Sequence, residues 1–344
     1  MTKIEIEKKI DLQQYETLLN NNQSTFYHTI NHLNFLSDML EITPNFITLK
    51  NDKELLGLLP FFVKESKEGK VINSLPFFGS YGGFVCDSVE NQKLILAEMN
   101  TYNKENDVLS SVIIQSPFSQ KNEIYEKIYK HNFKEERLCQ CIVLNNNEED
   151  LWNKFEQRVR RAVRKSQKSG LIVKSVEPDN NLFQIFFQMH KKEMESKNGK
   201  PKPEKFFNCV KRNFISNKDY EIFSAEKNGK SIAFLLIFYS YPYVEYYMPA
   251  YDSTLKHLQG TSLLIWESIK SALNKKMQFY NFGGTWKTQS ELYLYKRGWN
   301  SKDFFYNYYI YGDIERARKI GLEKIKQNYP FFYVFSFSDL QKYP

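Results

Sequence analysis

The chain has 344 residues, which is enough for two domains or one large one. Hydrophobic residues make up 42% of it, and Gly (14) and Pro (11) are scarce, so a disordered, collagen-like or low-complexity chain is excluded. The four cysteines form no Cys-x-x-Cys pair, so neither a disulfide framework nor a zinc ribbon is expected. The first residues are charged, and the longest apolar run, residues 232–241, is too short to span a bilayer. These features predict a cytoplasmic protein without a signal peptide or transmembrane segment.

The hydrophobic pattern predicts alternating strands and helices in the first part of the chain. Strands are predicted over residues 46–49, 55–63, 108–115 and 139–144, and helices over residues 90–103 and 124–131. The segment 71–85 is rich in Gly and aromatic residues, which is typical of a strand that meets a loop at a cleft. This order predicts an α/β or α+β domain over residues 1–147.

The second part begins with a basic helix and continues with a similar alternation. Helices are predicted over residues 182–197, 205–214, 261–272 and 290–296, and strands over residues 220–226, 231–239, 244–251, 279–282 and 304–311. Gly283 and Gly284 are expected to end the strand 279–282. The second domain is predicted over residues 148–312. Residues 313–344 are predicted to form a C-terminal helix, 314–327, and an aromatic tail that packs back on the first domain.

Positive charge is concentrated in one part of the sequence. The net charge is +8, but residues 151–218 carry +11 and the rest of the chain carries −3. Such a block suggests a polyanionic partner, which can be nucleic acid, a diphosphate or an acidic membrane surface. A solvated lysine-rich face is the alternative.

The segment 148–169 is predicted to form a single amphipathic helix with a cationic outer face. Asn147 and the acids after it provide an N-cap and first-turn charges, and Gly170 provides the end. One face of the helix is apolar, with Trp152, Phe155, Val159, Ala162 and Val163. The other face carries Arg158, Arg161, Lys165 and Lys168, with Arg160 and Arg164 beside them. Because guanidinium groups bind phosphate in bidentate fashion, Arg158, Arg161, Arg164 and Lys165 are the predicted phosphate-binding residues.

Several stretches of the sequence, taken in order, resemble a known family. They are VRRAVRKSQKSGL (159–171), FFQMH (186–190), KPKP (200–203) with Phe206 and Phe207, AEKNGKSIA (225–233), YNFGG (280–284) and LYKRGW (294–299). SLPF (74–77) and GGFVCD (82–87) match more loosely. This set is similar to the FemABX peptidyltransferases and the wider FemAB-like branch of the GNAT acyltransferase superfamily. The resemblance rests on the ordered set of stretches rather than on any single motif.

The resemblance implies a fold and a choice of acyl donors. The fold would consist of two tandem GNAT-like domains, each a mixed central sheet flanked by helices, with the acceptor bound in a cleft between them. The donor would be aminoacyl-tRNA, as in known members, or acyl-CoA. The loop that holds the CoA pyrophosphate in GNAT enzymes corresponds to residues 257–262, where Gly260 is retained but the leading cation and the trailing Gly of the signature are replaced. No tightly bound cofactor is expected. No metal is expected either, because His28 and His32 have helical spacing but lack the sequence context of a metal site.

The resemblance also implies the residue that stabilises the transition state. Acyl transfer to an amine passes through a tetrahedral oxyanion, and a fixed positive donor gives it the largest help. Lys296 matches the family lysine and is the predicted donor, with an exposed surface lysine as the alternative. Tyr295 takes the place of the usual aromatic residue and Asn281 the place of the usual acid. Gly283, Gly284 and Tyr295 are expected to contact the substrate.

The attacking amine must also lose a proton. Asp87, His190 and Glu245 are the candidate bases, although each has a structural alternative and the substrate itself can take the proton. Tyr81 and Tyr247 are predicted at the mouth of the cleft, where they would stack on a base or a sugar.

Together these features predict an N-acyltransferase that transfers an aminoacyl or small acyl group to an amine of a cell-envelope precursor, such as a muropeptide or an amino sugar. An acyl-CoA-dependent sugar N-acyltransferase of surface-polysaccharide synthesis is one alternative, and a non-catalytic RNA-binding protein on a GNAT scaffold is another. The expected partners are a small-molecule or lipid-linked precursor, tRNA, and a peripheral contact with a membrane surface.

Overall fold

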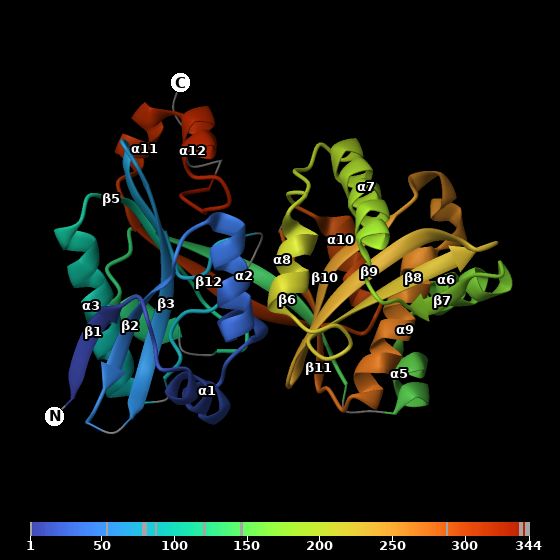
Figure 1. Ribbon diagram of the computed structural model, residues 1–344, viewed down its shortest axis with the longest axis horizontal. Coiled ribbons are helices and arrows are strands. Elements are labelled where there is room, and N and C mark those ends of the chain that lie inside the picture. The colour runs from blue at the N-terminus through green and yellow to red at the C-terminus, as the bar shows by residue number, and fades with distance from the viewer. Residues whose placement is uncertain are drawn as a thin grey trace. The chain divides into compact units, whose positions relative to one another are not determined.

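A computed structural model describes residues 2–52, 54–77, 81–86, 88–119, 122–144, 147–286, 288–336 and 340. The chain forms two compact units (Figure 1), of which the first contains Met1–Arg137 and Phe305–Pro344 and the second Leu138–Phe304. The chain passes from one unit to the other within two long strands, β6 (Phe133–Val143) and β12 (Lys302–Gly312). The units therefore divide inside strands, several residues before the loops where the sequence places the domain ends.

The first unit is built on a mixed sheet. Its strands lie in the order β1 (Lys3–Glu7), β2 (Asn45–Lys50), β3 (Leu55–Ser66), β4 (Gly69–Asn73), β5 (Val108–Ile114) and β12. The pair β4–β5 is parallel and the other pairs are antiparallel. The antiparallel β2–β3 pair confirms the paired strands predicted for residues 46–49 and 55–63.

Helices cover both faces of this sheet. On one face lie α3 (Val89–Glu105) and α4 (Asn122–Ile128), where Ile95 packs in one cluster with Ile47. On the other face lies α1 (Leu12–Asn21), whose Tyr15 ring contacts that of Phe46, the residue before Ile47. The short 3₁₀ helix η1 (Phe26–His28) and α2 (Ile30–Leu40) follow α1 in the chain.

The C-terminal segment folds with the first unit. The predicted helix over residues 314–327 is two helices, α11 (Ile314–Ile320) and α12 (Leu322–Asn328), because Gly321 adopts a positive φ of 87° between them. The tail after α12 is anchored by Tyr329, whose hydroxyl donates to the Gly69 carbonyl at 2.9 Å.

The second unit has a mixed sheet between two helical layers (Figure 1). Its strands lie in the order β6, β11 (Phe279–Thr285), β10 (Tyr243–Tyr251), β9 (Lys230–Ser240), β8 (Tyr220–Lys227) and β7 (Ile172–Ser175). The pair β10–β11 is parallel and the others are antiparallel. A mixed sheet flanked by helices in each unit confirms the predicted architecture.

Successive residues of β9 show which helices lie on which face. Leu235 and Ile237 point into the cluster formed with α9 (Gly260–Asn274). Phe234 stacks on Phe186 of α7 (Asn180–Ser196), and Phe238 contacts Phe214, which follows α8 (Phe206–Asn213). Among the described residues no helix is long and apolar enough to cross a membrane.

The basic helix predicted over residues 148–169 is broken into α5 (Glu148–Lys154) and α6 (Gln157–Lys168). Asn147 is its N-cap, as predicted, and accepts from the amide of Asp150 at 2.9 Å. The break follows from Phe155, whose buried ring contacts Trp266 and Trp299 and whose backbone is extended. The Nη1 of Arg160 donates to carbonyls at the end of α5, including that of Phe155 at 2.9 Å. Arg160 therefore satisfies carbonyls that the broken helix leaves without partners.

Candidate active site

Lys296 lies in α10 (Ser290–Arg297), and its side chain is buried, with 4% of the residue exposed. Its Nζ donates to the Gly284 carbonyl at 2.9 Å, to Thr285 Oγ1 at 2.9 Å and to the Gly283 carbonyl at 3.2 Å. Three acceptors match the three N–H groups of an ammonium. Burial lowers the pKa of Lys296 to about 8. This position excludes the alternative of an exposed surface lysine.

A bulge in β11 brings these acceptors together. The pairing of β11 with β6 shifts register between Asn281 and Gly284, and Gly283 adopts a positive φ of 71°. The strand therefore continues to Thr285, and the prediction that the glycines end it is wrong. Gly284 is exposed, and a Cβ built on Gly283 would meet no atom within 4 Å. A ligand can therefore approach bare backbone directly beside the buried ammonium.

A buried polar network continues from the bulge to the neighbouring strands. Asn281 Oδ1 accepts from the Gly283 amide at 2.8 Å and from Cys139 Sγ at 2.9 Å. Asn281 Nδ2 donates to Glu245 Oε2 at 2.8 Å, and Glu245 is 2% exposed. The network thus connects β6, β11 and β10 across the sheet.

Glu245 and Asn281 lie where two parallel strands separate. β10 and β11 pair over three residues of each strand, and the last pair is Glu245–Asn281. Beyond this pair β10 continues beside β9 to Tyr251, and β11 continues beside β6 to Thr285. The carboxylate and the amide are therefore the last facing residues before the strands part.

Three hydrogen bonds join α6, the start of α9 and α10. Arg158 Nη2 of α6 donates to the Leu294 carbonyl of α10. Ser166 Oγ, further along α6, donates to the Gln259 carbonyl at 2.8 Å, immediately before α9. Tyr295 of α10 is hydrogen-bonded to Ser262 in the first turn of α9, and burial raises its pKa. The helix that carries Lys296, the start of α9 with Gly260, and the cationic helix are thereby held together.

The predicted phosphate-binding cations have different surroundings. Arg158 forms an ion pair with Glu156, with Nε and Oε2 2.7 Å apart, and Arg164 lies over the Trp152 ring at 5.4 Å. Arg164 also lines an open hollow of about 400 Å³ with Trp152, Trp266, Gln167, Glu148 and Glu149. Arg161 and Lys165 are exposed, and among the described residues neither forms an ion pair. Arg161 and Lys165 are therefore the better placed of the four to bind a phosphate.

His190 and Tyr247 lie on the opposite face of the sheet from α9. His190 Nε2 accepts from the Lys202 amide at 3.2 Å, and burial lowers the pKa of His190 to about 4. Lys202 Nζ lies over the Tyr247 ring at 4.9 Å, and burial lowers its pKa to about 8. Burial and the nearby Glu245 raise the pKa of Tyr247. The neutral His190 ring thus holds the loop that carries Lys202 over Tyr247.

The remaining candidates belong to the first unit. Tyr81 is fully buried, and its ring contacts those of Tyr27 at 4.7 Å and Tyr306 at 5.6 Å, which corrects the prediction that it is open to a ligand. Asp87 lies outside the described residues. His28 and His32 are buried, which lowers their pKa values to about 4 and about 3. In the described part of the chain no three His, Cys, Asp or Glu side chains are grouped to hold a metal ion.

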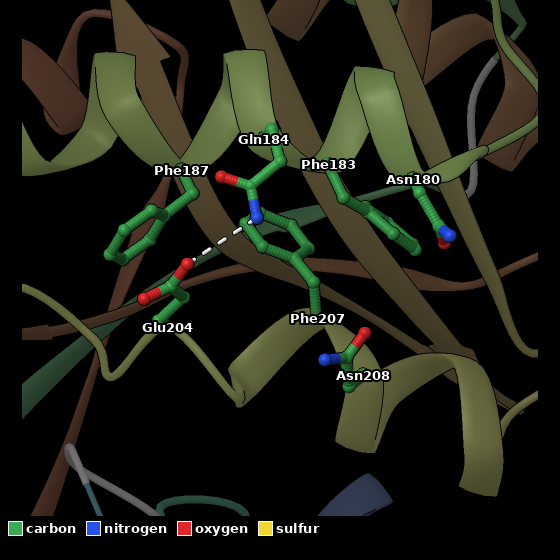
Figure 2. A pocket seen from close by; sticks show the side chains of 7 residues that line it. All are labelled: Asn180, Phe183, Gln184, Phe187, Glu204, Phe207 and Asn208. Carbon is green, nitrogen blue, oxygen red and sulfur yellow. Dashed lines mark hydrogen bonds between the residues drawn. The ribbon is translucent and has the colours of Figure 1, made fainter.

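A second hollow of about 200 Å³ lies between α7 and α8 (Figure 2). Three phenylalanine rings line it, those of Phe183, Phe187 and Phe207. Polar side chains surround them, and Gln184 Nε2 donates to Glu204 Oε1 at 3.4 Å. None of the predicted site residues lines this hollow.

Sequence reasoning missed Cys139, Gln140 and Thr285, which lie around Lys296 and Asn281. Thr285 Oγ1 donates to Gln140 Oε1 at 3.0 Å and so connects the lysine contact to β6. Two adjacent glycines inside a strand are a signal for a bulge, and this signal could have pointed to Thr285. Cys139 and Gln140 carry no local signal, because their place in the site depends on the pairing of β6 with β11.

The site lies largely in a segment with a recognisable domain type. Residues 153–297, which include α6, α9, α10 and the β11 bulge, match the family model described as an acetyltransferase (GNAT) domain. No curated protein gives a significant match to the chain.

Solved structures with the same fold cover nearly the whole chain. FemX superposes with a TM-score of 0.70 at 14% identity, over 88% of this chain and 96% of FemX. The C-terminal domain of a putative lysylphosphatidylglycerol synthetase from Agrobacterium fabrum gives 0.59 at 8% identity, over 92% and 96%. A tandem GNAT protein from the clavulanic acid biosynthesis pathway gives 0.54 at 8% identity, over 89% and 98%. The predicted tandem GNAT fold is therefore confirmed, the resemblance to FemAB-like proteins is confirmed for the fold, and the domain match supports an acyltransferase.

Proposed function

We propose that the protein is an N-acyltransferase that transfers an aminoacyl or small acyl group to an amine of a cell-envelope precursor, such as a muropeptide or an amino sugar. The observation that carries this proposal is the buried ammonium of Lys296 beside the open backbone of Gly283 and Gly284. Burying a charged ammonium costs free energy of folding, so its presence inside the protein calls for a function. Stabilisation of an oxyanion is such a function, and the GNAT domain match supports it. FemX and a protein named for lysylphosphatidylglycerol synthesis, both of the same fold, support an envelope acceptor.

The proposed reaction uses Lys296 and Glu245. The acceptor amine attacks the acyl carbonyl carbon, and the oxygen of that carbonyl becomes an oxyanion near the bulge. The ammonium stabilises this charge by exchanging its longest contact, that to Gly283 at 3.2 Å, for the oxyanion. Glu245 takes the proton of the amine and returns it to the leaving oxygen or sulfur, so that collapse of the intermediate expels the alcohol of an ester donor or the thiol of a thioester donor. Lys296 keeps its contacts to Gly284 and Thr285 and so stays in place.

We assign the proton transfer to Glu245 because of its position in the network. Glu245 is joined to the bulge through Asn281, whereas His190 already accepts a hydrogen bond from Lys202. Tyr247 lies two residues beyond Glu245 in the same strand, and Tyr295 precedes Lys296. Both tyrosines remain candidates for contacting the acceptor or the acyl group.

The donor is proposed to carry phosphates. Arg161 and Lys165 are exposed on α6, and α6 is bonded both to α10 and to the loop before α9. Aminoacyl-tRNA and acyl-CoA both fit this description. The GNAT domain match favours acyl-CoA, whereas the sequence resemblance to the FemABX peptidyltransferases implies aminoacyl-tRNA. Both donors present a carbonyl and a polyanion, so the proposed roles of the site residues are the same for either.

The proposal is tested by offering the purified chain both donors with amine acceptors. Transfer is followed from charged tRNA with a radiolabelled amino acid, and from acetyl-CoA by thiol release, to a muropeptide precursor and to glucosamine. The expected result is transfer from one donor class that Lys296→Met reduces strongly and that the exposed-site control Lys302→Met leaves unchanged. RNA binding without any acyl transfer would contradict the proposal and would favour a non-catalytic RNA-binding role.

A further inference from the structure

The side chain of Asn281 occupies the centre of the polar network and faces the proposed base. It donates to Glu245 Oε2 at 2.8 Å through Nδ2 and accepts from the Gly283 amide at 2.8 Å through Oδ1. Asn281 is fully buried, and Glu245 is its direct partner in the β10–β11 pairing. A single planar amide thus fixes the carboxylate and the bulge relative to each other.

The chemistry of an amide suits this place. An amide presents a donor on one side and an acceptor on the other, and it carries no charge at any pH. A donor aimed at a carboxylate favours the ionised form, which is the form that accepts a proton. A carboxylate at position 281 would instead put two like charges 2.8 Å apart and would make one of them hold a proton.

From this geometry we infer that Asn281 is a positioning residue, which orients the Glu245 carboxylate toward the acceptor amine and couples it to the bulge that surrounds Lys296. The inference rests on the proposed function, because it gives Glu245 a partner in that reaction. Asn281 itself touches neither the acyl group nor the amine in this scheme. Its effect on the reaction is transmitted through Glu245.

Tyr247 and Cys141 interact electrostatically with Glu245, and further titratable groups lie on the elements packed around it, so the test must separate their effects. They come from its own strand, from β6, from α10 and from the helical layer over this face: Tyr247, Cys139, Cys141, Lys296, His190 and Lys202. A change at position 281 leaves each of these side chains in the protein. A shift that Asn281 variants produce, and that Glu245→Gln abolishes, is therefore assigned to Glu245.

Two variants test the inference in the full-length chain. Asn281→Ala removes both functions of the amide, whereas Asn281→Asp keeps an acceptor for the Gly283 amide and replaces only the donor that faces Glu245. Gln278→Ala is the matched control, because it removes an amide just before β11 whose Nε2 donates to the Tyr241 hydroxyl. Thermal unfolding of each variant shows whether it is folded at the assay temperature.

The first measurement is the pH dependence of kcat/KM for acyl transfer. We expect both Asn281 variants to move the rising limb to higher pH, by about one pH unit or more for Asn281→Asp because of the added like charge. We expect kcat at neutral pH to fall about tenfold or more while KM for the donor stays the same, because the base is protonated and the donor site is untouched. Wild-type profiles for both variants, or full activity of Glu245→Gln, would overturn the inference.

The second measurement does not depend on activity. Infrared titration of protein with ¹³C-labelled glutamate, taken as the difference between each protein and its Glu245→Gln counterpart, reports the ionisation of this one carboxylate. The expected result is a midpoint at higher pH in both Asn281 variants than in the wild type and in Gln278→Ala. If the Glu245 titration midpoint moves in the Asn281 variants but the wild type transfers no acyl group, the proposed function is wrong, while the contact between Asn281 and Glu245 is confirmed. An unmoved midpoint in an active enzyme overturns the positioning role alone.

Discussion

Replacing Lys296 with methionine removes the buried ammonium and keeps an unbranched side chain of similar length. We expect turnover to fall by about 10²–10³-fold, the usual cost of losing one donor to an oxyanion. The change also has a predictable effect on stability. The pKa of Lys296 is lowered from 10.5 in an unfolded chain to about 8 in the folded protein, so the folded state binds the proton less strongly.

The sign of the pH dependence follows from this difference. Below pH 8 the lysine is charged in both states, and the folded protein bears the whole cost of burying the charge. Between pH 8 and 10.5 the folded lysine loses its proton first, so the free energy of unfolding rises with pH. Linkage between the two pKa values gives a gain of about 2 kcal/mol from pH 7 to pH 9.5. Lys296→Met lacks this contribution.

The assay combines urea unfolding at both pH values with the transfer assay at neutral pH. Other titrating groups are common to the wild type and the variant, so their contributions cancel in the difference between the two proteins. Lys302→Met, which removes an exposed lysine, is expected to behave as the wild type in both measurements. Near-wild-type transfer by folded Lys296→Met would refute the oxyanion role. If the free energy of unfolding rose equally with pH in the wild type and in Lys296→Met, the conclusion that the Lys296 ammonium is buried would be refuted.

Three further changes give distinct results. Neutralising Arg161 and Lys165 with glutamine is expected to weaken binding of the phosphorylated donor and to reduce the slope of log K against log salt by about 1 for each charge lost, as measured by calorimetry at several salt concentrations. Arg160→Ala leaves the carbonyls at the end of α5 without their donor and is expected to lower the free energy of unfolding by about 1–2 kcal/mol in urea titrations. Gly283→Ala should lower the free energy of unfolding by about 1 kcal/mol. The cause is backbone strain at a positive φ, since an added Cβ would meet no atom within 4 Å. Its effect on kcat should be larger than that loss explains, because the bulge faces the proposed oxyanion.

The sequence predicts the order of elements well where local signals are strong. The hairpin between β8 and β9 follows from the Asn-Gly turn at residues 228–229, and the N-cap at Asn147 follows from its side chain and the acids after it. The break between α5 and α6 is different, because Phe155 fits the helical pattern of apolar residues. Its ring is held by Trp266 and Trp299, which are distant in sequence, so tertiary packing overrides the local preference.

In the site, too, the sequence predicts individual residues, whereas their burial and contacts depend on segments that are distant in the chain. The sequence predicts Lys296, Glu245 and the two glycines as site residues, and the structure joins Glu245 to the bulge through Asn281. The burial of Lys296 could not be predicted, because a lysine with polar neighbours in a short helix is usually exposed. It depends on the bulge, which turns the carbonyls of Gly283 and Gly284 toward the ammonium.

The structure also changes what the positive charge of α6 implies about the partner. The helix carries six Lys and Arg residues and no acid, which from sequence alone suggests a polyanionic partner of any size, from a diphosphate to nucleic acid or an acidic membrane surface. Three of the six have protein partners, since Arg158 binds Glu156 and the Leu294 carbonyl, Arg160 binds carbonyls at the end of α5, and Arg164 lies over Trp152. The other three, at positions 161, 165 and 168, span seven residues, or about 10 Å at 1.5 Å per residue. A stripe of this length matches a few adjacent phosphates, as in a diphosphate or a single-stranded RNA end. Neutralising about three phosphates predicts a slope of log K against log salt of about −2 to −3, and a much steeper slope would show that a more extended nucleic-acid contact lies outside α6.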